Sequence, residues 1–103
     1  MRRSFDSSTL SQLRGMPSEV ALALLAIHLK ADASFVPLKD SASRRWYART
    51  ERGEFEILTT GTKWYDTRAK RGGGGAIDLA IYLCDLSFVD AVKSLIQRQH
   101  ADG

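Results

Sequence analysis

The most constraining feature of this sequence is a run of four glycines, Gly72 to Gly75, between a basic segment and an apolar one. Glycine has no side chain to pack and loses the most backbone freedom on folding, so the run is predicted to lie outside helices and strands. The residues before it, Thr67 to Arg71, are basic, and those after it, Ala76 to Leu83, are apolar and helix-forming. The run therefore predicts a loop that leads into a helix.

The chain is short enough for a single hydrophobic core. It has 103 residues, of which 44% are hydrophobic and 26% charged, the proportions of an ordinary folded domain. We predict a polar arm over residues 1–15, one domain over 16–99 and a tail over 100–103. Within the arm, residues 8–14 form either a short helix or a loose segment.

The sequence lacks a transmembrane segment, a secretory signal and paired cysteines, and these absences predict its cellular location. The apolar run from Val20 to Leu29 has about half the length that crosses a bilayer, so no transmembrane helix and no membrane partner is expected. The basic N-terminus has no apolar stretch behind it, so no secretory signal is expected. The single cysteine, Cys84, excludes an intramolecular disulfide and a multi-cysteine zinc site. These features indicate a cytoplasmic protein that carries no metal and no cofactor.

Hydrophobic periodicity predicts an α+β domain. A helix is expected over residues 17–30, where Pro17 and Glu19 suit the first turn. Strands are expected over residues 44–49, 54–59 and 63–66, with a turn at Thr60-Gly61. Two helices follow, over 76–83 and from Ser87, an N-cap residue with Asp90 three positions on. The prediction is a three-stranded antiparallel sheet flanked by one N-terminal and two C-terminal helices.

The positive charge is concentrated in the middle of the chain. Residues 44–71 carry eight Lys and Arg against four Asp and Glu. Clustered positive charge attracts polyanions and favours contacts with phosphate. The alternative is an ordinary solvated surface whose charges happen to be basic.

The glycine run and the bases before it suggest a phosphate site. A helix N-terminus offers unpaired N–H groups, and glycines let a phosphate approach the backbone closely. The expected ligands are Arg68, Lys70 and Arg71 with the backbone of Gly72, Gly73, Gly74 and Gly75. No Lys-Ser or Lys-Thr pair follows the glycines, so the pattern is not a nucleotide-binding P-loop. The alternatives are a flexible linker and close packing beside the helix.

The predicted strands interleave aromatic and basic residues. Single-stranded nucleic acid is bound by stacking its bases on aromatic rings while cations follow its backbone. Strand alternation predicts a solvent-facing platform, with Trp46 and Trp64 in the core instead. The platform residues are Arg45, Tyr47 and Arg49 on one strand and Lys63 and Tyr65 on another.

No arrangement of residues indicates catalysis. The two histidines are far apart and neither has a metal-ligand pattern around it, so the chain is predicted not to be an enzyme. Asp78 is expected on the surface of its helix or in a hydrogen bond near the glycines. Cys84 is expected to be a small core or half-buried residue.

Four blocks between Arg45 and Ile96 carry a resemblance to a known family. They are Glu54–Ile57, Trp64-Tyr65, Gly73–Leu79 and Ser87–Val92 with Leu95. At this spacing they resemble the N-terminal zinc-ribbon domain of bacterial and phage DNA primases. In that family a Cys-Pro-x-His pair and a Cys-x-x-Cys pair hold zinc, but the corresponding positions here are Arg45, Ala48, Asp66 and Ala69.

The resemblance therefore implies the zinc-ribbon-like fold without its metal. The chain is similar to metal-free variants at the start of primase-like proteins of plasmids and integrative elements, ahead of a TOPRIM catalytic domain. It implies a non-catalytic module that binds single-stranded DNA in replication of a mobile element. A TOPRIM primase, a helicase or another replication protein is the implied partner.

A second hypothesis is an interaction or oligomerisation module. The helix predicted over 17–30 has apolar residues on more than one face, so it is either well buried or paired with another chain. A polar substitution at Leu24 or Leu25 that abolishes oligomers would support this hypothesis, whereas salt-sensitive binding of nucleic acid supports the first.

Overall fold

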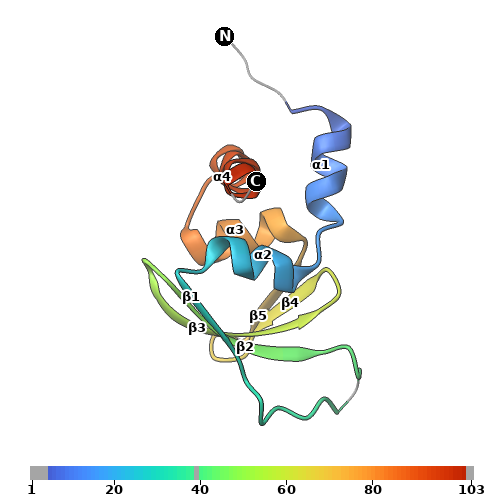
Figure 1. Ribbon diagram of the computed structural model, residues 1–103, viewed down its shortest axis with the longest axis vertical. Helices are drawn as coiled ribbons and strands as arrows, with labels where there is room; N and C mark the ends of the chain where they lie inside the picture. The colour runs from blue at the N-terminus through green and yellow to red at the C-terminus, as the bar shows by residue number, and fades with distance from the viewer. Residues whose placement is uncertain (1–4, 39, 102–103) are drawn as a thin grey trace.

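The computed structural model describes residues 5–38 and 40–101. Within this part of the chain, four helices cover one side of a five-stranded antiparallel sheet, which confirms the α+β class (Figure 1). The sheet has two more strands, and the helical layer one more helix, than the sequence predicted. The elements are α1 (Ser7–Arg14), α2 (Ser18–Leu25), β1 (His28–Ala31), β2 (Arg44–Thr50), β3 (Gly53–Thr60), β4 (Lys63–Asp66), β5 (Arg71–Gly74), α3 (Ala76–Cys84) and α4 (Phe88–Ala101).

The three central strands lie where the alternation of apolar and polar residues predicts them. The sheet order follows the chain, β1-β2-β3-β4-β5, so every strand pairs with the one before it. The register sets Tyr47 opposite Glu56 and Leu58 opposite Tyr65. Gly61 makes the turn between β3 and β4 at φ +60, a conformation that residues with a Cβ rarely adopt.

The prediction of one helix over 17–30 is wrong beyond Leu25. Ala26 is extended, with ψ 142, and residues 28–31 form β1 along the edge of β2. His28 and Lys30 are exposed while Leu29 between them is half-buried, which is the period of a strand. Pairing with β2 supplies the backbone hydrogen bonds that further helix would have supplied, and it turns Leu29 toward the core.

The prediction that the glycine run lies outside regular structure is also wrong. Residues 71–74 form β5, which pairs with β4. Close packing explains the composition, because a Cβ on Gly73 would lie 2.0 Å from Asp78 Oδ2 and 2.7 Å from Trp64 Cζ2. Of the alternatives considered for the run, close packing beside the helix is the one that the structure has.

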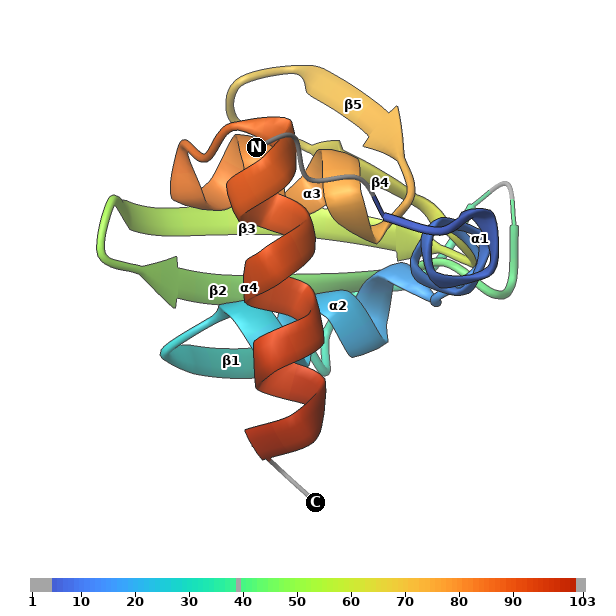
Figure 2. The ribbon, with the colours of Figure 1, turned by 90° about the horizontal axis from the view of Figure 1, so that it is seen from above.

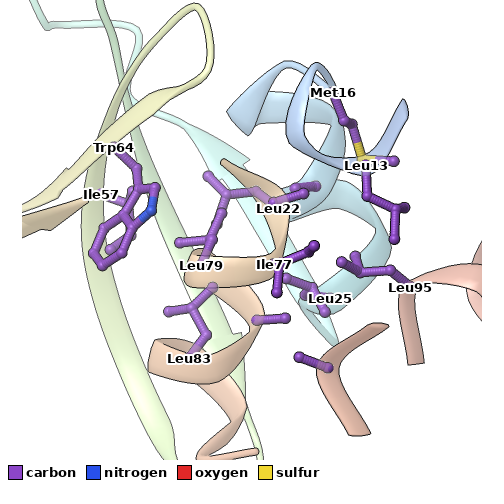
Figure 3. Close-up of a cluster of buried hydrophobic side chains, with 14 of the residues drawn as sticks. Leu13, Met16, Leu22, Leu25, Ile57, Trp64, Ile77, Leu79, Leu83 and Leu95 are labelled. Atoms are coloured by element: carbon purple, nitrogen blue, oxygen red, sulfur yellow. The ribbon is translucent and has the colours of Figure 1, made fainter. Parts of the chain in front are cut away.

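The core lies between the sheet and the helices (Figure 3). Leu22 and Leu25 of α2 meet Leu79 of α3 and Leu95 of α4, all essentially inaccessible to solvent. Figure 2 shows α4 lying across α2 and α3 on the side away from the sheet. None of the helices in the described part of the chain is long and apolar enough to span a membrane.

The two ends of the chain add to this layer. Of the two alternatives for residues 8–14, the structure has the helix, α1, whose Leu13 is buried in the core. Asp6 caps α1 by accepting a hydrogen bond from the Thr9 N–H at 2.8 Å. Ser87 likewise accepts one from Asp90 N–H at 3.1 Å, as predicted for the last helix. The predicted arm and tail are otherwise outside the description over 1–4 and 102–103, and α4 continues through residue 101.

Candidate nucleic-acid interface

Among the described residues, no helix or strand covers the side of the sheet opposite the helices (Figure 1). Side chains alternate along each strand, and the buried ones, such as Ile57 and Trp64, face the helices. Their neighbours face away and form what we call the open face. It comprises His28, Lys30, Arg45, Tyr47, Arg49, Glu54, Glu56, Leu58, Thr60, Lys63, Tyr65, Gly72 and Gly74.

A hollow of about 390 Å³ lies at one end of the open face, where β1, β2 and β3 meet. Tyr47, 38% exposed, forms part of its wall. The charged and polar side chains that line it are His28, Lys30, Arg49, Glu54 and Arg68. Three permanent cations against one carboxylate give the hollow a positive potential, which favours an anion there.

Asp32, just after β1, holds two of the predicted platform residues. Its Oδ2 accepts hydrogen bonds from Arg45 Nε at 2.8 Å and from the Tyr47 hydroxyl at 3.1 Å. The Arg45 Nη2 atom lies 2.7 Å from the same oxygen. Arg45 is therefore neutralised within the chain, and Tyr47 is fixed with its ring on the surface.

These contacts shift the pKa values of Asp32 and Tyr47. Hydrogen bonds from Ser34 and then from Arg45 hold the pKa of Asp32 well below its usual range. The hydrogen bond to the Asp32 carboxylate, more than burial, raises the pKa of Tyr47. Asp32 is thus a fixed negative charge at neutral pH.

A second aromatic residue, Tyr65, lies on the open face beyond β3. It is 41% exposed, and it shares a cross-strand row with Leu58 and Arg45. Its ring lies over Gly72, where a Cβ would come within 2.9 Å of Tyr65 Cδ1. Tyr47 and Tyr65 are two strands and two residues apart, a separation of about 12 Å from sheet spacings. Lys63 faces the same way as Tyr65.

The turn between β4 and β5 directs the arginines of the predicted basic cluster to opposite sides of the sheet. Asp66 is buried and organises the turn, because its Oδ1 accepts the N–H groups of Arg68 and Ala69, each at 2.9 Å. Arg68 reaches the hollow on the open face. Arg71 lies opposite buried Asp66 in the register of β4 and β5, and its guanidinium is on the helix side, 5.3 Å from the ring centre of Tyr82. Lys70, at φ 58, lies in the turn between them.

The expected phosphate cradle at the glycines is therefore not assembled. Gly74 N–H donates to Asp78 Oδ2 at 3.2 Å, and Gly75 N–H donates to the Thr62 carbonyl at 2.8 Å. A carboxylate occupies the place at the start of α3 that an anion would need. The expectation that Asp78 hydrogen-bonds near the glycines is confirmed. Gly72 and Gly73 thus serve close packing, and the Gly74 N–H is already taken by Asp78, so all three glycines drop out of the proposed contacts.

Sequence reasoning missed five residues of this surface. His28 and Lys30 join the hollow because β1 is a strand, and their alternation about Leu29 was the available signal. Asp32, Glu54 and Glu56 place negative charge among the cations, and the Glu56 carboxylate accepts a hydrogen bond from the Thr67 hydroxyl. The open face is therefore mixed in charge, with its cations concentrated around the hollow.

Of the four positions that correspond to zinc ligands, Arg45 faces away from Ala48 and Asp66. Arg45 is on the open face, Ala48 is buried on the other side, and Asp66 is engaged by backbone N–H groups and by Tyr82. In the described ranges, 5–38 and 40–101, no group of three or more His, Cys, Asp or Glu could hold a metal ion.

Comparison with known proteins gave no match to a family model, to a curated protein or to a solved structure. The candidate interface therefore rests on the geometry of this chain alone.

Proposed function

We propose that this protein is a non-catalytic module that binds single-stranded nucleic acid, with DNA as the expected ligand, on the open face of its sheet. The observation that carries the proposal is the exposed ring of Tyr47 beside a hollow lined by Lys30, Arg49 and Arg68. An aromatic surface with cations around it is the general requirement for binding unpaired bases.

Each group has a defined part in this binding. A base stacks on Tyr47, worth about 1–3 kcal/mol, while its phosphates contact Arg49 and Arg68. Tyr65 and Lys63 offer a second base and phosphate position farther along the face. Unpaired bases can reach both rings, whereas duplex bases are already stacked on each other. The proposal therefore predicts a preference for single strands.

The acidic residues weaken the binding. Arg45 is already paired with Asp32, and Glu54 and Glu56 lie between the cations. We expect dissociation constants of about 1–100 µM at physiological salt, the range of non-specific binding.

The biological setting of the proposal comes from the resemblance to primase zinc-ribbon domains. On that basis the module serves replication of a mobile element and works with a TOPRIM primase, a helicase or another replication protein. A partner of this kind would supply the catalytic activity.

Packing within the chain accounts for much of the apolar segment that suggested an oligomerisation helix. Ala21, Leu22 and Leu25 of α2 are buried against the chain's own core. A polar group at Leu25 would therefore unfold the domain and could not report on oligomers. Val20 and Ile27 remain exposed, at 44% and 59%.

The experiment is a fluorescence anisotropy titration with labelled single-stranded and duplex DNA of equal length. The wild type should bind the single strand more tightly, and Tyr47→Ala should weaken that binding by about tenfold or more because a stacking surface is lost. Tyr47→Phe keeps the ring and should retain most of the affinity.

Two arginines three positions apart provide a matched control. Arg68→Ala should weaken binding because Arg68 lines the hollow, whereas Arg71→Ala should leave it unchanged because Arg71 lies on the helix side. Equal losses in both variants, or no binding of single strands by the wild type at low salt, would refute the proposal.

A further inference from the structure

The segment between β1 and β2 exposes apolar side chains at its tip. Val36 is 71% exposed and Leu38 95%, the highest value among the large apolar residues that the structure describes, and Pro37 lies between them. We call Val36, Pro37 and Leu38 the apolar tip. Figure 1 shows this segment projecting below the sheet, on the side away from the helices. Single exposed apolar residues are common, but neighbouring ones on a projection indicate a contact surface.

The residues that precede the tip, 32–35, which we call its N-terminal root, are hydrogen-bonded to residues of the open face. Asp32, which binds Arg45 and Tyr47, also accepts hydrogen bonds from Ser34 N–H at 3.0 Å and from its hydroxyl at 2.6 Å. The Phe35 N–H donates to the Asp32 carbonyl at 3.2 Å. The Arg45 guanidinium lies 5.1 Å from the ring centre of Phe35. The tip is therefore continuous with the residues that orient Tyr47.

The C-terminal root is fixed as well. Asp40 accepts hydrogen bonds from Ala42 N–H at 2.9 Å and, through its carbonyl, from Ser43 N–H at 3.0 Å. The hydroxyls of Ser43 and Thr60 lie 2.7 Å apart, which joins the segment to β3. With both roots fixed, the tip is held out from the sheet by structured turns on either side.

The register places the tip at one end of the open face. The hollow lies at the His28–Arg49 end, and the tip begins after the Ala31–Trp46 pair at the opposite end. A strand of nucleic acid that runs along β2 from the hollow, over about four residues or 13 Å, arrives at the tip. At that point apolar groups replace the cations.

We infer that the apolar tip contacts the end of a duplex, so that the preferred ligand of the open face is a junction between single-stranded and double-stranded DNA. This inference rests on the proposed function and specifies its substrate. Leucine, proline and similar side chains are the groups that proteins insert between base steps, so their chemistry suits contact with the face of a base pair. The single strand would follow the open face while Leu38 and Val36 pack on the terminal base pair.

A lipid surface is another ligand that takes exposed apolar side chains beside cations. Binding in a bilayer interface normally uses the whole apolar face of an amphipathic helix. The tip has two large exposed side chains in a turn, and its root is part of the open face. The observations therefore favour the duplex end.

The test compares three labelled DNA molecules: a single strand, the same single strand extending from a hairpin duplex, and the blunt hairpin alone. The wild type should bind the junction about tenfold more tightly than the single strand, the gain expected from partly burying two aliphatic side chains. The double variant Val36→Ser with Leu38→Ser should bind single strand and junction equally. Its affinity for the single strand should match that of the wild type.

A matched double variant controls for the loss of exposed apolar surface in general. Val20→Ser with Val89→Ser changes side chains that are 44% and 40% exposed on helices, and it should keep the preference for the junction. Equal binding of junction and single strand by the wild type would overturn the inference and leave the proposed function standing. Failure to bind any single strand would overturn both. Sedimentation with phosphatidylglycerol vesicles that depends on Leu38 would assign the tip to lipid and also overturn the inference.

Discussion

Two adjacent glycines in β5 differ in the space that surrounds them. A Cβ on Gly73 would collide with Asp78 and Trp64, whereas a Cβ on Gly74 would meet nothing within 4 Å. The same substitution therefore has different consequences at neighbouring positions of one strand.

We expect Gly73→Ala to destabilise the domain by about 1–3 kcal/mol, the usual cost of overpacking. Gly74→Ala should be neutral or stabilise it by about 0.5 kcal/mol, because alanine restricts the unfolded chain. Urea unfolding of the two variants measures the difference. Similar losses in both would mean that strand composition, and not the contact with Asp78 and Trp64, decides the cost.

Asp32 makes the free energy of unfolding depend on pH in the acidic range. Its carboxylate is stabilised by Ser34 and Arg45, so its pKa is lower in the folded chain than in the unfolded one. Such a group stabilises the fold above its unfolded pKa of about 3.9 and loses that contribution as the pH falls toward the folded value.

Asp32→Asn should therefore be less stable than the wild type at neutral pH, and the difference should shrink as the pH drops below about 4. Thermal melts of both proteins across that range provide the measurement. A difference in melting temperature that stays constant from neutral to acidic pH would show that the carboxylate charge contributes nothing.

At the scale of elements, residue patterns predicted the strands that carry their own side-chain signal. Phe55 and Ile57 alternate with Glu54 and Glu56 along β3, and that period placed the strand. On β2, alternation also placed Tyr47 on the face that the structure leaves open.

The edge strands could not be predicted in this way, because their stability comes from neighbours. β5 has three glycines and no strand signal, and it exists because Trp64 and Tyr65 lie against it. β1 follows a helix-forming run, its alternation about Leu29 is short, and its pairing with β2 is what makes it a strand. Missing β1 hid His28 and Lys30, and with them one of the three permanent cations around the hollow.

For the molecule as a whole, the two sides of the sheet divide stability from binding. The helices and the inner side form the core, and the open face adds little to it. Four cations on or beside that face carry no ion pair in the described part of the chain: Lys30, Arg49, Lys63 and Arg68.

We expect each of these four cations to contact one phosphate. The logarithm of the observed association constant for single-stranded DNA should then fall with the logarithm of the salt concentration, with a slope of about −3. Affinity should then drop about 50-fold from 50 to 200 mM salt, and Arg49→Ala should reduce the slope by about 0.7. Anisotropy titrations across this salt range test the number of phosphate contacts. A slope near zero would mean that phosphate contacts do not contribute to binding.

The sequential order of the sheet also has a consequence for folding kinetics. Each strand pairs with the strand before it, and from β2 to β5 the connections are short, so these closures cost little entropy and occur early. In the helical layer, α1 and α2 pack on α3 and α4, from the opposite end of the chain. We expect the meander of β2, β3 and β4 to form in the transition state and the helices to dock afterwards. Substitutions in the helical core would then act mainly on the unfolding rate.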